Sequence, residues 1–179
     1  IVTMPPRVWG LVVAAAILIS VNWVIYIWAV NNGHVVEAAL GYFINPLVSV
    51  VLGVLLFRER LRIPQWTAVG LGTGAVVVLA VAGGSFPWVA LSLAFSFGFY
   101  GLVKKIIPLA PTASLTAEGL VQFVPALIYV VTITVAGTST FASYGSGHVL
   151  LMASTGLVTC VPLLAFAAAA QSLPLSVLG

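Results

Sequence analysis

The chain has 179 residues, of which 62% are hydrophobic and 5% are charged, and its mean hydropathy is +1.24. A soluble domain carries about 25% charged residues, so this chain cannot cover itself with a surface that water wets. The net charge of +3 comes from six basic residues, which are too few for a nucleic-acid site. The single cysteine, Cys160, cannot form an intrachain disulfide. The composition therefore predicts an integral membrane protein.

Six apolar segments are long enough to cross a bilayer, which takes about 20 apolar residues per helix. Polar or Gly/Pro-rich turns separate these segments. A β-barrel is excluded because the segments are continuously apolar and do not alternate. The sequence therefore predicts an all-α transmembrane fold. Its expected spans are residues 8–30, 35–57, 64–82, 87–103, 114–136 and 148–170.

Lysine and arginine occur only at alternate ends of the expected spans. Arg7 precedes the first span, the turn 58–62 contains three arginines, and Lys104 and Lys105 follow the fourth span. The other three turns contain no lysine or arginine. Basic loops mark the cytoplasmic side of a membrane protein. We therefore expect Arg7 and the turns 58–62 and 104–113 to lie in the cytoplasm.

A weak internal repeat relates the first and last expected spans. Shifting the sequence by 138 residues aligns Gly41 with Gly179 and the polar turn after the first span with the one after the last. These two spans run in opposite directions, as an inverted repeat requires. A five-helix unit would place three helices of the first repeat in residues 1–86 and three of the second in residues 87–179. We therefore expect six spans of a ten-helix inverted-repeat transporter, with two helices missing at each end.

Three stretches of the sequence carry a resemblance to known proteins. The most specific begins NWVIYIWAVN at Asn22 and includes FINP at residues 43–46. The others are residues 57–61 and residues 93–105. Together they resemble the RarD-type permeases of the EamA family, within the drug/metabolite transporter superfamily. The resemblance implies ten helices in two EamA repeats and transport of small molecules across the bacterial inner membrane. Members of this subgroup are associated with chloramphenicol sensitivity.

Polar side chains inside the spans are the candidate transport residues, because at bilayer depth they cost free energy unless they meet a partner or water. Asn22 and Tyr26 share one face of the first span, and Tyr42 and Asn45 share one face of the second. For the two asparagines the alternative is a structural hydrogen bond between helices or to their own backbone. The expected substrate-binding residues are Asn22, Trp23, Tyr26, Tyr42, Asn45, Ser96 and Tyr100.

Two of the three acidic residues are candidates for coupling or gating. Glu37 lies in the first turn of the second span, at the outer mouth of the expected cavity. Glu118 and Gln122 share a face of the fifth span near its cytoplasmic end, where we expect them to form a gate. The alternative for both glutamates is stabilisation of a helix N-terminus.

The remaining charged residues receive structural interpretations. Glu59 lies between two arginines and is expected to be a surface ion-pair partner. Lys104 and Lys105 are expected to reach the lipid headgroups. Kinks that let helices bend are expected at Pro46, Pro125 and Pro162.

No catalytic arrangement is present in the sequence. It contains no aspartate and no phosphate-binding loop, and Cys160 has no positioned base. We therefore expect no enzyme activity, cofactor, metal or nucleic-acid partner. The expected function is secondary transport of a small organic solute by alternating access. A passive facilitator and a non-transporting scaffold or sensor subunit are the alternatives. Besides the lipid bilayer and the solute, proton coupling and a homodimer stay open.

Overall fold

The structure is a computed structural model that describes residues 4–82, 86–141 and 144–178. Within those ranges the chain is all-helical, and six of its helices are long and apolar enough to cross a membrane. The predicted fold class and number of spans are therefore confirmed, and the chain is a multi-pass membrane protein. The helices are α1 (Pro6–Asn31), α2 (Val35–Phe57), α3 (Ile63–Ala82), α4 (Trp88–Ile106), α5 (Pro111–Val135), α6 (Gly145–Ser172) and the short α7 (Leu175–Leu178).

Local sequence explains where several helices begin and end. Prolines occupy the first helical positions of α1 and α5, where their missing N–H costs nothing. The turn after α1 contains Gly33 at a positive φ of 81°, which glycine adopts without strain. After α2, Arg58 adopts the left-handed conformation with φ 53° and returns its N–H to the Gly53 carbonyl.

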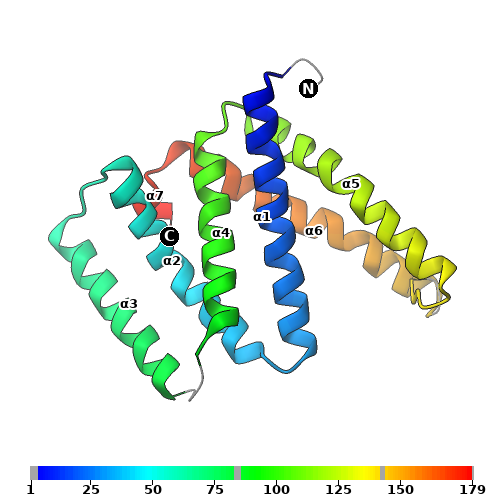
Figure 1. Cartoon of the computed structure of the whole chain (residues 1–179), viewed down its shortest axis with the longest axis horizontal. Helices are drawn as coiled ribbons and strands as arrows, with labels where there is room; N and C mark the ends of the chain where they lie inside the picture. Colours follow the sequence, from blue (N-terminus) through cyan, green and yellow to red (C-terminus); the bar gives the residue numbers. More distant parts are fainter. Residues whose placement is uncertain (1–3, 83–85, 142–143, 179) are drawn as a thin grey trace.

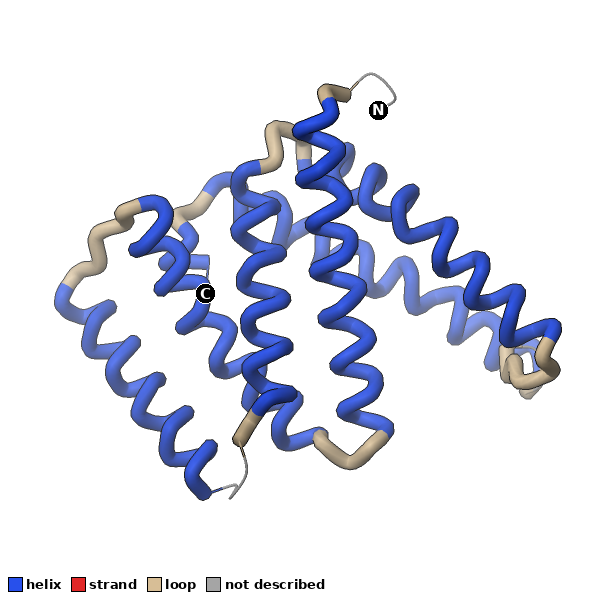
Figure 2. The backbone as a smooth tube through the Cα atoms, in the orientation of Figure 1, coloured by secondary structure: helices blue, strands red, loops and turns tan. Residues whose placement is uncertain are grey.

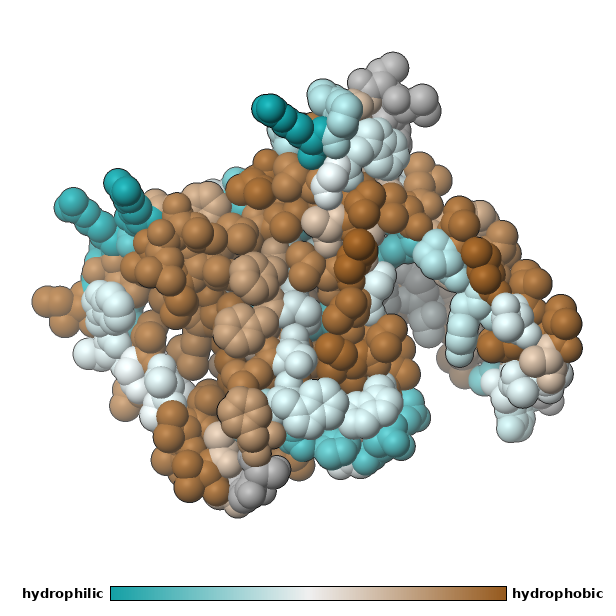
Figure 3. Space-filling view, viewed as in Figure 1, coloured by the Kyte–Doolittle hydropathy of each residue, from teal (hydrophilic) through white to brown (hydrophobic). Residues whose placement is uncertain are grey.

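The helices run alternately up and down, so the basic segments share one end of the molecule. Figure 1 places the start of α1, the α2–α3 loop and the α4–α5 loop at its upper end, and the α1–α2 turn at its lower end. The tube in Figure 2 follows the same path through the loops. Hydrophilic groups project from this upper end in the space-filling view of Figure 3. The assignment of that end to the cytoplasm stays a prediction.

Helix α4 lies at the centre of the packing and contributes to each of the three buried clusters. It packs most closely against α2, where two glycines, which have no side chain, let the two backbones approach each other. A Cβ atom built on Gly41 would lie 3.0 Å from both the Ala90 carbonyl oxygen and the Leu93 Cβ. A Cβ atom built on Gly98 would lie 2.6 Å from Cγ1 of Val48. These distances leave no room for a methyl group at either position.

Replacing Gly41 or Gly98 with alanine should therefore destabilise the bundle, by about 1–3 kcal/mol as is typical of an overpacked core. Gly70→Ala on α3 is the matched control, because nothing lies within 4 Å of a Cβ atom at that position. The measurement is the melting temperature of the full-length protein in detergent. Equal melting temperatures for all three variants would contradict the close α2–α4 contact.

Two charged side chains hold the break between α6 and α7. Lys105 Nζ donates a hydrogen bond to the Leu173 carbonyl oxygen at 2.5 Å. Glu59 accepts hydrogen bonds from the backbone N–H groups of Leu175 and Ser176, both at 2.8 Å. The cation thus neutralises the carbonyl end of one helix, and the anion neutralises the amide end of the next. We call this arrangement the α6–α7 clamp.

The clamp corrects the sequence interpretations of both its side chains. Glu59 was expected to pair with neighbouring arginines on the surface, but its carboxylate binds the backbone of α7. Lys105 was expected to reach lipid headgroups, but its ammonium group binds the end of α6. Burial raises the pKa of the Glu59 carboxyl group. Hydrogen bonds from Ser176 and Leu175, with the charge of Lys105, outweigh burial and leave that pKa below its ordinary value.

Because folding lowers this pKa, the clamp should stabilise the structure at neutral pH and weaken as pH falls below the ordinary glutamate value of 4.5. Hydrogen exchange of residues 173–178 in the full-length protein, corrected for the intrinsic pH dependence of exchange, measures this. Protection should stay constant from pH 7 to about pH 5 and should drop as the pH falls from about 4.5 towards 3. Glu59→Ala should already lack it at neutral pH, whereas Arg7→Ala should match the wild type. Full protection in Glu59→Ala would refute the clamp.

Candidate functional site

A cleft of about 800 Å³ opens between α1, α5 and α6, with α4 at its base. Figure 3 shows the surface hollowed between the body of the molecule and the projecting α5–α6 hairpin. Sites for drug-sized ligands occupy roughly 300–1,000 Å³ and often lie between helices of a bundle. The cleft is therefore large enough to hold a small organic molecule.

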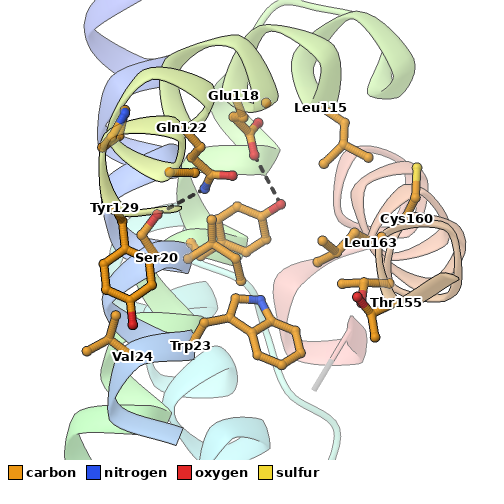
Figure 4. Close-up of a pocket in the computed structure, with 17 residues that line it drawn as sticks. Ser20, Trp23, Val24, Leu115, Glu118, Gln122, Tyr129, Thr155, Cys160 and Leu163 are labelled. Carbon is orange, nitrogen blue, oxygen red and sulfur yellow. Dashed lines mark hydrogen bonds between the residues drawn. The ribbon is translucent and has the colours of Figure 1, made fainter. Parts of the chain in front are cut away.

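The cleft is lined by aromatic rings together with a few polar groups. Trp23 comes from α1, Tyr100 from α4 and Tyr129 from α5. Figure 4 shows Trp23 and Glu118 at opposite ends of this lining, with α6 residues such as Thr155 and Cys160 across from α1. Such a surface suits an amphipathic solute, because rings can stack on the aromatic side chains while polar groups find hydrogen bonds.

Gln122 ties the α5 wall of the cleft to α1. Its Nε2 donates hydrogen bonds to the Ala16 carbonyl oxygen and to Ser20 Oγ, both at 3.1 Å. The dashed line between Gln122 and Ser20 in Figure 4 marks the second of these bonds. Moving α5 away from α1 would break both hydrogen bonds. Gln122 therefore links two walls of the cleft.

Beside the cleft, four polar side chains form a buried group, which we call the Lys104–Glu118 cluster. Lys104 Nζ lies 2.6 Å from Glu118 Oε1 and donates to Ser114 Oγ at 2.8 Å. Ser114 Oγ donates to the same Oε1 at 2.8 Å, and Tyr100 Oη donates to Oε2 at 3.2 Å. Both carboxylate oxygens are therefore hydrogen-bonded. The exposed fractions of Lys104 and Glu118 are 0% and 1%.

Helical periodicity produces this cluster. Tyr100 and Lys104 lie one turn apart on α4, and Ser114 and Glu118 lie one turn apart on α5. The short α4–α5 loop brings the two faces together. Burying the charge of Lys104 or of Glu118 alone would cost several kcal/mol, so each of these two residues needs the other as its partner.

The comparisons with known proteins can now be set beside this geometry. Residues 1–81 match the EamA-like transporter family. The chain is 58% identical to Protein RarD of Streptomyces exfoliatus over 97% of its length, covering 55% of that protein. It is 45% identical to Protein RarD of Escherichia coli K12 over 100% of its length, covering 60% of that protein. These matches support the resemblance of the chain to the RarD-type members of the EamA family.

A further relative is an uncharacterized transporter of Pseudomonas aeruginosa, 44% identical over 97% of the chain and covering 58% of that protein. The chain thus spans little more than half the length of the curated relatives it matches. The names of these relatives indicate a transporter rather than an enzyme. No solved structure matches the chain.

The sequence interpretation of Lys104 is wrong. We expected this side chain to reach lipid headgroups, but it is fully buried against α5. The position of Lys104 close to the end of α4 favoured the headgroup interpretation. The better signal was its spacing, since Lys104 continues the i+4 face that carries Ser96 and Tyr100.

The residues expected to bind substrate do not form one cavity. Asn22, Tyr42 and Asn45 border a separate hollow of about 10 Å³, which has room for at most about one water molecule. Asn22 Nδ2 donates hydrogen bonds to the Leu93 carbonyl oxygen and to Ser96 Oγ, both at 2.9 Å. The arrangement of Asn22 and Ser96 therefore fits the structural alternative, a hydrogen bond joining α1 to α4.

Aromatic contacts connect this small hollow to the cleft. The Tyr26 ring meets Trp23 and Tyr42 edge-on, at centroid distances of 6.1 and 5.9 Å. Trp23 lines the cleft, Tyr42 borders the hollow, and Tyr26 lies between them. Of the expected substrate-binding residues, the cleft is thus lined by Trp23 and Tyr100.

The other candidates are spread over the structure. Glu37 pairs with His34 at 2.8 Å, at the end of the molecule opposite the basic loops, and is not among the residues that line the cleft. Glu118 and Gln122 both line it, and their role as a gate stays a prediction. The three expected kink prolines lie inside helices, Pro46 in α2, Pro125 in α5 and Pro162 in α6.

Lys104→Met should strongly destabilise the full-length protein, by about 3–5 kcal/mol, because it leaves the Glu118 carboxylate buried without a partner. Adding Glu118→Gln in the same chain should restore much of the loss, since no uncompensated charge then remains. The measurement is thermal unfolding in detergent. Arg7→Met is the control for loss of a cation outside the cluster, because Arg7 is exposed at the start of α1. A single variant as stable as the double variant would show that the pair is not coupled.

Proposed function

We propose that the full-length protein is a secondary transporter that moves a small organic solute across the bacterial inner membrane by alternating access. The observation that carries this proposal is the cleft of about 800 Å³, lined by aromatic rings and bordered by a buried ion pair. The transporter names of the EamA relatives support it. We further propose that the end carrying the basic loops faces the cytoplasm.

The position of the cleft relative to the proposed repeats supports a transport role. Its α1 wall belongs to the proposed first repeat, and its α4, α5 and α6 walls belong to the second. Transporters built from inverted repeats bind their solutes at the interface between the repeats. Movement of one repeat against the other would therefore change the shape of this cleft.

Two polar contacts supply a basis for gating. Gln122 joins α5 to α1, and the Lys104–Glu118 cluster joins α5 to α4. Of the two acids proposed for proton coupling, Glu118 borders the cleft whereas Glu37 is paired with His34 outside it. The geometry therefore gives more support to Glu118 than to Glu37 as the acid that responds to a proton.

Counterflow of radiolabelled chloramphenicol into proteoliposomes containing the full-length protein tests the proposal. The wild type should show counterflow that saturates with solute concentration. Trp23→Ala should reduce it on the order of tenfold, the equivalent of about 1.4 kcal/mol of lost contact. Trp66→Ala is the matched control, because this exposed tryptophan lies on α3, away from the cleft.

Three other outcomes would be informative. Flux that rises without saturation would favour a passive facilitator with the same architecture. A rate equal to that of protein-free liposomes would show that chloramphenicol is not transported. A rate equally reduced in both tryptophan variants would show that the cleft is not the transport site.

A further inference from the structure

We infer that the cleft selects solutes without net charge, and that Lys104 is the specificity-determining residue that keeps it neutral. The inference rests on the proposed function and deepens it, because it names the substrate class of the same cleft. Lys104 is not expected to touch the solute. It acts through Glu118, which borders the cleft while Lys104 lies behind it.

The charges around the cleft are the first support. Of the described residues that line it, Glu118 is the one with an acidic or basic side chain that is charged at neutral pH in its ordinary state. Without compensation the cleft would carry one negative charge and attract cations. Lys104 supplies the compensating charge from a position with no solvent exposure, 2.6 Å from the carboxylate. The two charges cancel beside the cleft.

The hydrogen bonds of Glu118 are the second support. Its Oε1 accepts from Lys104 and Ser114, and its Oε2 accepts from Tyr100. Because Glu118 is 1% exposed, an ammonium group on a solute would have to lose its water and push neighbouring side chains aside to reach the carboxylate. A solute carboxylate would meet Glu118 rather than the hidden ammonium group of Lys104. At low dielectric both encounters are costly, so either sign of charge is disfavoured.

A neutral polar group finds a partner instead at Gln122. The Nε2 of this side chain is used in the contact with α1, whereas its Oε1 accepts no hydrogen bond within the described part of the chain. A solute hydroxyl or amide N–H can donate to that oxygen, and its ring can pack on Trp23 or Tyr129. The cleft thus offers contacts to an uncharged aromatic solute, whereas the one charge among its described lining residues is already paired with Lys104.

Binding of three matched probes to the full-length protein in nanodiscs tests this inference. The probes are para-nitrophenethyl alcohol, para-nitrophenethylamine and para-nitrophenylacetic acid, which are neutral, cationic and anionic versions of one ring. Equilibrium dialysis measures each dissociation constant, with empty nanodiscs subtracted. The assay is run at about pH 8, where the amine probe is protonated and a carboxylate with an ordinary pKa is ionised.

The wild type should bind the alcohol on the order of tenfold more tightly than either ion. Lys104→Met should shift the preference toward the amine, and Glu118→Gln should shift it toward the acid. The double variant Lys104→Met/Glu118→Gln should again prefer the alcohol, which separates charge from folding damage. Lys105→Met is the control and should keep the wild-type order, since this lysine binds the end of α6 outside the cleft.

A wild-type preference for the amine or the acid would overturn the inference while leaving saturable counterflow intact. An unchanged order in both single variants would show that the pair does not set selectivity. Conversely, binding in the expected order without any counterflow would support this inference and contradict the proposed transport activity. Failure to bind any of the three probes would overturn the assignment of the cleft as a solute site.

Discussion

A charge pair with no access to solvent joins α4 to α5, and the cleft depends on it. Lys104 and Glu118 cannot separate without leaving a charge buried, so they fix the angle at which α5 leaves the body of the molecule. That angle holds α5 beside α1, where Gln122 completes the contact. Trp23 of α1 and Tyr100 of α4 consequently border the cleft, and Tyr100 also stacks on Phe166 of α6 with 5.9 Å between the ring centroids.

The spans and their ends were predictable because they depend on local properties. An apolar run of sufficient length has to form a helix in a bilayer, and the turns between the runs carry Gly, Pro or charge. The observed bounds of α2, Val35–Phe57, coincide with those expected. The alternation of basic turns follows from the same local reading, and the structure places those turns at one end.

The partners of the polar side chains were not predictable, because they lie far away in the sequence. Asn22 bonds to residues 71 and 74 positions later, and Glu59 bonds to residues 116 and 117 positions later. Helical periodicity shows which residues share a face, but it does not show which helix that face meets. For this reason Glu118 and Gln122 were correctly paired on one face, whereas the single expected cavity proved to be a cleft and a separate small hollow.

The α6–α7 clamp has a consequence for motion. Lys105 and Glu59 hold the two helix ends on either side of Pro174, and α7 packs with the α2–α4 core. The outer half of the α5–α6 hairpin, in contrast, packs against little else within the described residues. The clamp therefore acts as a pivot with a fixed base. A swing of the hairpin about it would widen the far mouth of the cleft while the contact between α2 and α4 stays as it is.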